Sequence, residues 1–120
     1  MAVNEASCVF CRILKGEIPS QKIYEDESSI VVRDVNPQAP FHLLVIPREH
    51  VPDIAGALRR EKGEERVGKL FNTSVRIATE QGFGSSGFRL VVNSGTDGGQ
   101  TVGHLHLHLM GGRQMTWPPG

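Results

Sequence analysis

The clearest alternation of apolar and polar positions lies near the C-terminus, where three histidines alternate with three leucines over residues 104–109. A period of two predicts a strand with the leucines on one face and all three imidazoles on the other. Neighbours on one face of a strand lie about 7 Å apart, close enough to share a phosphate-sized ligand or a metal ion. A polar strand face without function is the alternative, but three imidazoles that titrate near neutral pH indicate chemistry.

Other apolar runs predict the remaining elements. Apolar positions at three- and four-residue steps predict one long helix from Lys62 to Gln81, closed by Gly82 and Gly84. Shorter runs predict a short helix at Cys8–Leu14 and strands that begin at Lys22–Tyr24 and span Ser29–Val35, His42–Ile46 and Phe88–Asn93. The turn-rich residues 36–40 join two of these strands as an antiparallel hairpin. The order of elements predicts an α+β fold with an antiparallel sheet.

Composition narrows the class of protein. The chain has 120 residues, enough for one domain, and its 13 basic and 13 acidic residues give no net charge. Without a basic block, the sequence argues against a nucleic-acid binder or a membrane-surface binder. No run approaches the ~20 apolar residues of a membrane helix, so a cytoplasmic protein is expected. In a reducing compartment, the pair Cys8 and Cys11 indicates metal or redox chemistry before a structural disulfide.

A glycine-rich loop at residues 94–103 directly precedes the histidines. Alone it is an ordinary hairpin loop, but beside three imidazoles its main-chain amides predict a cradle for a phosphate group. An imidazole can attack phosphorus and form a phosphohistidine intermediate; the central His106 is best placed to attack, and His108 to donate to a phosphoryl oxygen. These motifs contain no lysine or arginine, so they suit a monoanionic phosphodiester or phosphoramidate better than a triphosphate that needs Mg²⁺.

Several motifs resemble the Hint branch of the histidine triad (HIT) family, the nucleoside phosphoramidases. The triplet HLHLHLM at residues 104–110 matches the family signature. Further matches are DVNPQAP at 34–40, HLLVIP at 42–47, VNSG at 92–95, DGGQTV at 97–102 and GGRQMTWPPG at 111–120. The resemblance covers nearly the whole chain. It implies a HIT-like fold in one domain over residues 1–120: a five-stranded antiparallel sheet, one long and one short helix, and a sheet continued across a homodimer.

The resemblance also implies a reaction and its residues. It implies hydrolysis of the P–N bond of nucleoside 5′-phosphoramidates, adenosine ones above all, with His106 as the nucleophile and His108 as the phosphate-binding partner. Thr101 stands where the branch usually has serine, and its extra methyl group narrows the channel of the leaving group. His42 matches a histidine behind the triad that orients an imidazole, although a plain buried histidine is equally compatible.

The nucleotide-binding residues follow from the same matches. Asp34 matches the carboxylate that holds the ribose hydroxyls, although an aspartate that closes a strand before a turn is an ordinary feature. Asn93 matches the amide near the 5′ oxygen, and Gly99, Gln100 and Thr101 match the phosphate loop. Five apolar residues match the positions that line the nucleotide base in the family: Val9, Phe10, Ile13, Val35 and Leu44. Ordinary core packing is an equally good explanation for each of them.

A structural zinc ion is a further expectation. Cys8 and Cys11 share one face of the predicted helix, and relatives in the family use the histidine two positions before the nucleophile as a ligand. With His50 and His104 they make a Cys₂His₂ set of the closed, structural kind. The alternative is two thiols packed as small hydrophobic side chains.

The ends of the chain complete the expectations. Residues 1–7 are expected to be a flexible N-terminus, and the tail 111–120 to dock at the dimer interface and active site, with Trp117 on the leaving-group side. No redox cofactor and no Mg²⁺ are expected, and the partners are a purine nucleotide of the AMP or GMP type and a second copy of the chain. Two rival functions remain: a hydrolase whose three histidines hold a catalytic zinc, and a nucleotide-binding scaffold with residual activity.

Overall fold

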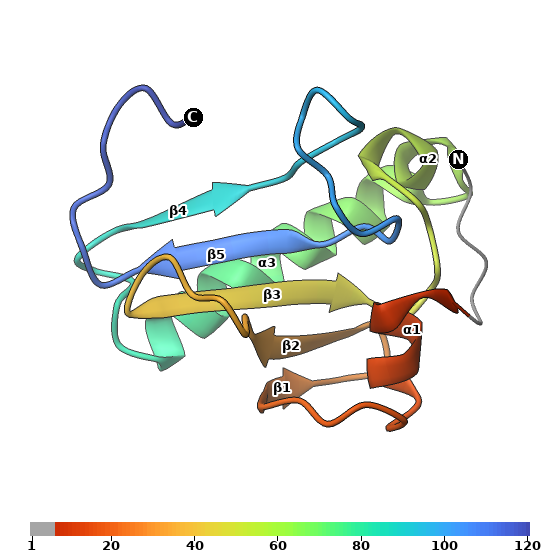
Figure 1. The fold of residues 1–120 in the computed structure, drawn as a ribbon, viewed down its shortest axis with the longest axis horizontal. Coiled ribbons are helices and arrows are strands. Elements are labelled where there is room, and N and C mark those ends of the chain that lie inside the picture. The colour runs from red at the N-terminus through yellow and green to blue at the C-terminus, as the bar shows by residue number, and fades with distance from the viewer. Residues whose placement is uncertain (1–6) are drawn as a thin grey trace.

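A single five-stranded sheet forms the centre of the molecule in this computed structural model, which describes residues 7–120 (Figure 1). Its strands run in the order β1-β2-β3-β5-β4, and every neighbouring pair is antiparallel. Their bounds are β1 Lys22–Glu25, β2 Ser29–Arg33, β3 Phe41–Pro47, β4 Phe88–Val91 and β5 Leu107–Gly111. The predicted α+β fold with an antiparallel sheet is confirmed. The expected flexible N-terminus falls almost wholly on residues 1–6, outside the described part.

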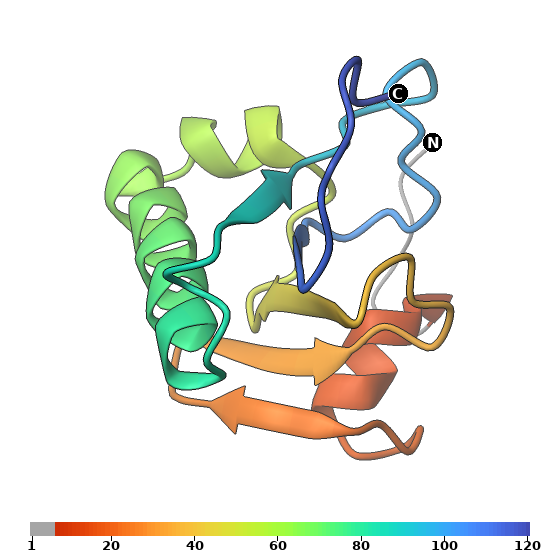
Figure 2. The same ribbon diagram turned by 90° about the vertical axis from the view of Figure 1, so that its left-hand side faces the viewer.

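Helices cover both faces of the sheet, and strands β2 and β3 are buried on both sides over most of their length. Helix α3 (Gly63–Glu80) lies on one face and the short helix α1 (Val9–Leu14) on the other (Figure 2). The leucines of the histidine segment, Leu105, Leu107 and Leu109, belong to the core on the α3 side. Ile30, Leu44 and other residues of the opposite pleat form a second, smaller core with α1. The histidines of the same segment therefore face α1.

Helix α3 matches the predicted long helix closely, and its buried positions include Val67, Leu70 and Ile77 at helical spacing. A second short helix, α2 (Ile54–Arg59), precedes it and was not predicted. The Asp53 side chain caps α2 by accepting the N–H of Gly56 at 2.8 Å. Only six residues long, α2 is too short to show a helical period in the sequence.

Three strand predictions extend beyond what the structure forms. Strand β5 begins at Leu107, so His104 and His106 precede it. The strands predicted at Ser29–Val35 and Phe88–Asn93 end at Arg33 and Val91. The pairing of β3 with β5 stops at Val45 and Leu107, and before that point the N–H of Leu105 donates to the carbonyl of Val51 at 2.7 Å. The inside–outside alternation nevertheless continues back to His104, because Leu105 is buried with the α3 core. None of the described helices combines the length and apolar character needed to cross a bilayer.

Candidate active site and metal centre

The three histidines face the same side but divide between two neighbouring groups. Phe10 of α1 packs edge-on against both His104 and His106, with ring centroids 5.8 and 4.9 Å away. His104 turns toward the cysteines of α1, whereas the His106 ring lies 5.0 Å from that of His108. The histidine segment thus contributes to a metal-type site at one end and to an imidazole cluster at the other.

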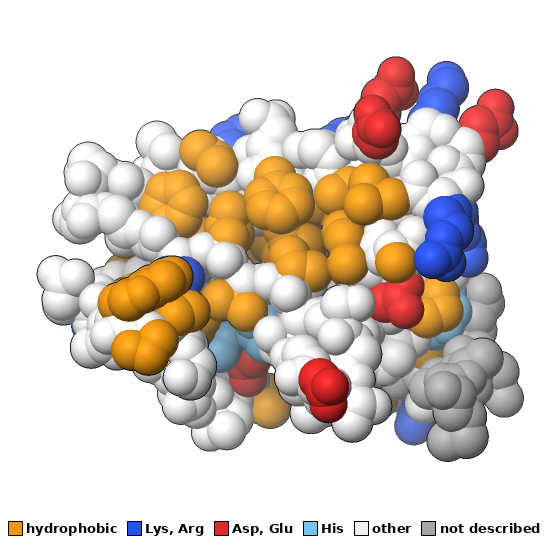
Figure 3. Space-filling model, turned by 90° about the horizontal axis from the view of Figure 1, so that it is seen from above, with side chains coloured by type: hydrophobic (Ala, Val, Ile, Leu, Met, Phe, Trp, Pro, Cys, Tyr) orange, Lys and Arg blue, Asp and Glu red, His pale blue; other side chains and the backbone are white. Residues whose placement is uncertain are grey.

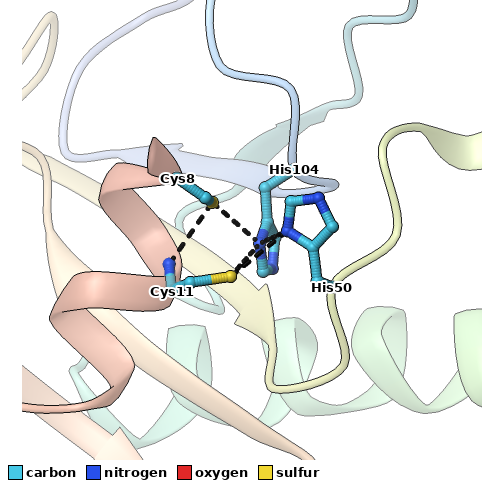
Figure 4. A group of neighbouring side chains, drawn as sticks. All are labelled: Cys8, Cys11, His50 and His104. Carbon is cyan, nitrogen blue, oxygen red and sulfur yellow. Dashed lines mark hydrogen bonds between the residues drawn. The ribbon is translucent and has the colours of Figure 1, made fainter. Parts of the chain in front are cut away.

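The cysteine–histidine group consists of Cys8, Cys11, His50 and His104, whose four potential ligand atoms lie within 4.8 Å of one another (Figure 4). The Nδ1 atom of His104 lies 3.3 Å from Cys8 Sγ, 3.6 Å from Cys11 Sγ and 3.1 Å from His50 Nδ1. Cys11 Sγ lies 3.2 Å from His50 Nδ1. In a tetrahedral zinc site such atoms lie about 3.3–3.8 Å apart, so the set fits a zinc ion.

The surroundings of this group favour metal ligation over mere packing. The Nε2 atom of His104 lies 2.9 Å from the carbonyl oxygen of Pro47 and donates its hydrogen there, which leaves the Nδ1 lone pair facing the two sulfur atoms. Cys8 caps α1, and its Sγ atom accepts the N–H of Cys11 at 3.3 Å, a contact that stabilises a thiolate. Both cysteines are free of disulfides and buried. Cysteine and histidine ligands in this number are those of a structural zinc site.

The two ring nitrogens of His106 have different surroundings. Its Nδ1–H donates to the carbonyl oxygen of His104 at 2.8 Å, so the lone pair of the neutral ring lies on Nε2. Among the described residues, every fully buried side-chain nitrogen or oxygen has a hydrogen-bond partner. His106 Nε2 makes no hydrogen bond within that part of the chain, so it is not sealed in the interior. The geometry therefore leaves a nucleophilic lone pair within reach of a bound molecule.

His42 and His108 form a chain of hydrogen bonds whose direction can be worked out. The main-chain N–H of Gln38 donates to His42 Nδ1 at 3.0 Å, so the neutral His42 ring carries its hydrogen on Nε2. That atom lies 2.9 Å from His108 Nδ1, which must accept. The hydrogen of His108 is then on Nε2, where it can be donated to a ligand. His42 therefore sets the tautomer of His108, the orienting role that the sequence left open.

Burial keeps these rings neutral at physiological pH. Burial, and then the neighbouring imidazoles of His106 and His42, lower the pKa of His108 to about 4, although Asp34 acts in the opposite direction. Burial also lowers the pKa of His42 and of His106, and the Asp34 carboxylate partly opposes both shifts. In this neutral state, a ring nitrogen that carries a lone pair can attack an electrophile, and a ring nitrogen that carries a hydrogen can donate a hydrogen bond.

The pH dependence of stability follows from His108. Because its pKa is lower in the folded chain than in the unfolded chain, the unfolded state binds more protons between about pH 6.5 and pH 4. We expect the contribution of His108 to the free energy of unfolding to reach its full value above pH 6.5 and to decrease as the pH drops toward 4. Urea unfolding at successive pH values checks this. The variant His108→Gln, which cannot titrate, should lose less stability over this range; an equally steep loss in the variant would contradict the assignment.

Asp34 belongs to the same cluster. Its Oδ2 atom lies 3.3 Å from His42 Nε2, and its Oδ1 atom accepts the N–H of Asn36 at 2.8 Å. Asp34, His42 and His108 are close enough to form a second possible metal group. The hydrogen on His42 Nε2 argues against a metal ion there, because ligation would require a lone pair on that atom. A carboxylate has further lone pairs, so Asp34 can still accept hydroxyl groups of a ligand.

The glycine-rich loop is more tightly folded than a bare anion cradle. The amides of Gly99 and Gln100 donate to carbonyl oxygens inside the loop, those of Thr96 and Gly95, each at 3.0 Å. The Gln100 side chain also ties the loop down, since its Nε2 atom donates to the carbonyls of Pro52 and Val102. In the described part of the chain, the exposed Thr101 donates its amide to no protein acceptor. Of the three residues expected to bind phosphate, Thr101 is therefore the one whose main-chain amide is not used inside the loop.

The expected base-lining residues are divided between core and surface. Phe10 and Leu44 are buried in the core beside α1, and Ile13 packs against it. Val35 is 99% exposed, and Val9 is partly exposed at the start of α1. Asn93 lies beyond the end of β4 and is half-buried. The structure brings Phe10 to His106, whereas Asn93 makes no hydrogen bond to an imidazole among the described residues and Val35 is almost fully exposed.

Three main-chain contacts shape the site without any sequence signal of their own. The carbonyl of Pro47 orients His104, and the N–H of Gln38 orients His42. The Arg113 side chain of the tail donates from Nε to the carbonyl of Gln38 at 3.0 Å and so ties the tail to this loop. Main-chain groups are present at every position, so only the fold reveals which ones act. The Asn-Pro turn at residues 36–37 was the one available hint that a tight loop lies here.

The geometry agrees with comparisons to known proteins. The model of the HIT domain matches residues 15–115. The chain is 42% identical to a 14 kDa zinc-binding protein of Zea mays over 98% of its own length and 91% of the maize protein. A HIT family hydrolase from Legionella pneumophila has a similar structure, with a TM-score of 0.90, 44% identity and coverage of 95% of this chain and 100% of that one. A histidine triad protein from Clostridium difficile superposes with a TM-score of 0.88 and 39% identity, over 95% of this chain and 97% of that one.

This chain belongs to the HIT domain family. Its α+β fold and its five-stranded antiparallel sheet are those of HIT proteins. Two of the solved structures that share this fold, from Legionella pneumophila and Clostridium thermocellum, are described as HIT family hydrolases.

Proposed function

We propose that the protein hydrolyses the P–N bond of nucleoside 5′-phosphoramidates through a nucleotidyl intermediate on His106. The observation that carries this proposal is the tautomer of His106, whose Nδ1–H is held by the His104 carbonyl while Nε2 keeps its lone pair. A neutral imidazole with one free nitrogen is a nucleophile for phosphorus. Membership in a family that includes hydrolases supports the same reaction class.

The residues divide the work of the first step. His106 Nε2 attacks phosphorus, the P–N bond of the substrate breaks, and the amine leaves after taking a proton from solvent. The Nε2–H of His108 donates to a phosphoryl oxygen and stabilises the charge that builds up there. Thr101 offers its main-chain amide and hydroxyl group to the same phosphate, and Asp34 accepts the ribose hydroxyls.

Water completes the reaction. A water molecule attacks phosphorus, the bond between phosphorus and His106 Nε2 breaks, and one water proton passes to solvent. The products are an amine and a nucleoside monophosphate. We propose a purine nucleotide of the AMP or GMP type, with Phe10, Leu44 and the exposed Val35 beside the base and Asn93, Gly99 and Gln100 shaping the phosphate loop.

Capture of the intermediate tests the proposal. The protein is mixed with adenosine 5′-phosphoramidate, denatured within milliseconds in alkaline detergent, and digested for mass spectrometry. We expect one adenylyl group per chain at most, attached to His106. A nucleotide attached to another residue, or no attached nucleotide during active turnover, would contradict the proposal.

The second part of the proposal is a zinc ion on Cys8, Cys11, His50 and His104. Bound there, zinc supplies structural cross-linking, since four protein ligands leave no open position for substrate. The histidine that would hold it also provides the carbonyl that orients His106. His104 thus links the position of α1 to the tautomer of His106.

A zinc hydrolase that uses the three histidines as ligands is the alternative. The zinc-binding maize relative and the cysteine–histidine group support it insofar as both indicate zinc. The separation of His104 from His106 and His108 favours the first proposal, because no described metal group contains all three. A nucleotide-binding scaffold with residual activity is the remaining alternative, and turnover of an adenosine phosphoramidate with an amine leaving group distinguishes it.

We also propose a cytoplasmic homodimer joined through β4. This strand is an edge of the sheet and has one unpaired side. Apolar side chains gather on the face seen from above, where β4 lies (Figures 1 and 3), and α3 exposes Phe71 and Val75. A second copy can pair with the free edge and cover these side chains, which agrees with a sheet continued across the dimer. In such a dimer the exposed Trp117 of the tail lies near the partner's active site.

Charge at this face should disrupt the dimer. We expect light scattering to give the mass of two chains for the natural protein and of one chain for Val75→Arg, because a buried unpaired charge is strongly destabilising. The control Gln21→Arg adds the same charge beside β1, at the opposite edge of the sheet, and should remain dimeric. A natural protein that elutes as one chain at micromolar concentration would refute the dimer.

A further inference from the structure

A hollow with an apolar floor lies on the opposite side of the histidine segment from the imidazoles. It is bounded by the turn before β2, the end of β3, and helices α2 and α3, and its volume is about 340 Å³. This volume lies at the lower end of the range of small-molecule sites. Five buried apolar side chains form the floor: Val51, Ala57, Val67, Leu70 and Leu105.

Charged side chains surround this floor and are predominantly basic. Four basic and two acidic residues line the hollow: Arg48, Arg60, Arg66, Lys69, Glu27 and Glu49. Arg60 and Arg66 both bind the single carboxylate of Glu49, so two positive charges share one negative charge. The lining residues therefore carry a net charge of +2, which falls to +1 when Glu25, the ion-pair partner of Arg48 outside the hollow, is counted as well; the whole chain is neutral.

Lys69 is the basic residue with most capacity for a ligand. Its Nζ atom donates to the hydroxyl group of Ser28 at 2.9 Å, and it takes part in none of the ion pairs of the described residues. An ammonium group has three donors, so at least one remains for an anion. Lys69 stands next to Leu70 of the floor, which places a positive charge directly beside an apolar surface.

We propose that this basic hollow binds a small organic anion, whose apolar body enters the floor and whose carboxylate or sulfonate group reaches Lys69. The apolar floor supplies affinity through burial, and the charge at the rim selects an anion over a neutral molecule. A large ligand does not fit, because the volume admits only a compact body. A strongly polar ligand is disfavoured, because Ser29 is the one polar side chain among the buried residues that line the hollow.

The hollow is distinct from the proposed nucleotide site. Leu105 belongs to the floor, while its neighbours His104 and His106 face α1 on the other side of the segment. The N–H of Leu105 is bound to the carbonyl of Val51, so two floor residues are held together by the main chain. The hollow shares no lining residue with the imidazole cluster, and the proposal does not depend on the phosphoramidase reaction.

Binding can be tested with 8-anilinonaphthalene-1-sulfonate, which combines an apolar aromatic body with one sulfonate. The full-length, ¹⁵N-labelled protein is titrated with this probe and followed by NMR. We expect the probe to cause saturable chemical-shift changes at the amides of Ser28, Ala57, Val67 and Leu70. Excess AMP should leave these probe-induced changes unaltered. N-phenyl-1-naphthylamine, which lacks the sulfonate, should bind about tenfold more weakly, because one charge-assisted hydrogen bond is lost.

Three variants locate the site. Ala57→Phe fills the floor and should abolish binding; Lys69→Met keeps an apolar stem but removes the charge, and should weaken binding about tenfold. Arg59→Met removes an exposed charge on α2 that does not line the hollow, so binding should be unchanged. If Ala57→Phe fails to fold, the affinity of Lys69→Met for the probe still tests the proposal. Displacement of the probe by AMP, shifts centred on β4, no saturable shifts, or equal affinity of Lys69→Met and the natural protein would each overturn the proposal.

Discussion

Replacement of His106 by asparagine is expected to reduce turnover of an adenosine phosphoramidate by roughly 10⁴-fold or more, as loss of a covalent nucleophile does in other enzymes. The asparagine amide can take the place of the Nδ1–H group and donate to the His104 carbonyl, so the local fold should persist. What the variant lacks is the Nε2 lone pair. Calorimetric titration should find AMP bound within about threefold of the natural affinity, because nucleotide contacts other than the reacting nitrogen remain.

Variants at His108 provide the matched control for this experiment. His108→Gln keeps an N–H group near the position of Nε2, so it should lose about tenfold in turnover, whereas His108→Ala removes the donor and should lose about 10²–10³-fold. Steady-state and single-turnover kinetics of the three variants give the ranking. If His106→Asn retained more activity than His108→Ala, His106 would not be the nucleophile.

The architecture could be predicted from the sequence because its elements have strong local signals. Helix α3 shows a regular helical stripe, and the strands around Val31 and Leu44 are apolar runs bounded by turn residues. Helix α2 and the start of β5 at Leu107 were missed for different reasons. Helix α2 is too short to show a helical period, although its cap by Asp53 is a local contact. The start of β5 depends on where pairing with β3 ends, which is a tertiary contact that no periodicity records.

The residue types of the candidate site could be predicted from the sequence. The division of its histidines between the cysteine–histidine group and the imidazole cluster could not. Alternation placed the three imidazoles on one side, and the ring contacts of Phe10 with His104 and His106 agree with that placement. The assignment of each ring to a group depends on main-chain partners such as the carbonyl of Pro47 and the N–H of Gln38. A sequence gives no sign of where a main-chain dipole will point. The loop amides of Gly99 and Gln100 illustrate the same limit, because the loop uses them internally.

Removal of zinc is expected to lower the thermal midpoint of unfolding by roughly 10–20 °C. A metal present at 1,000 times its Kd stabilises the folded state by about 4 kcal/mol, and each kcal/mol shifts the midpoint of a domain of this size by about 3–5 °C. Metal analysis should find about one zinc per chain, and none after Cys11→Ser, because that variant breaks a closed set of four ligands. Arg12→Ser, which changes an exposed residue of the same helix, should retain the metal and most of the stability.

The same experiment separates structural zinc from catalytic zinc. If zinc is structural, Cys11→Ser measured well below its thermal midpoint should lose about 10–100-fold in turnover at most, through a less firmly held His104 carbonyl beside His106. The circular-dichroism midpoint and the metal content then fall together, while the covalent nucleotide on His106 still forms. If zinc performs the hydrolysis, turnover disappears with the metal and returns only when zinc is restored. An unchanged midpoint after complete chelation, with full metal loss verified, would show that the cysteine–histidine group contributes nothing to folding.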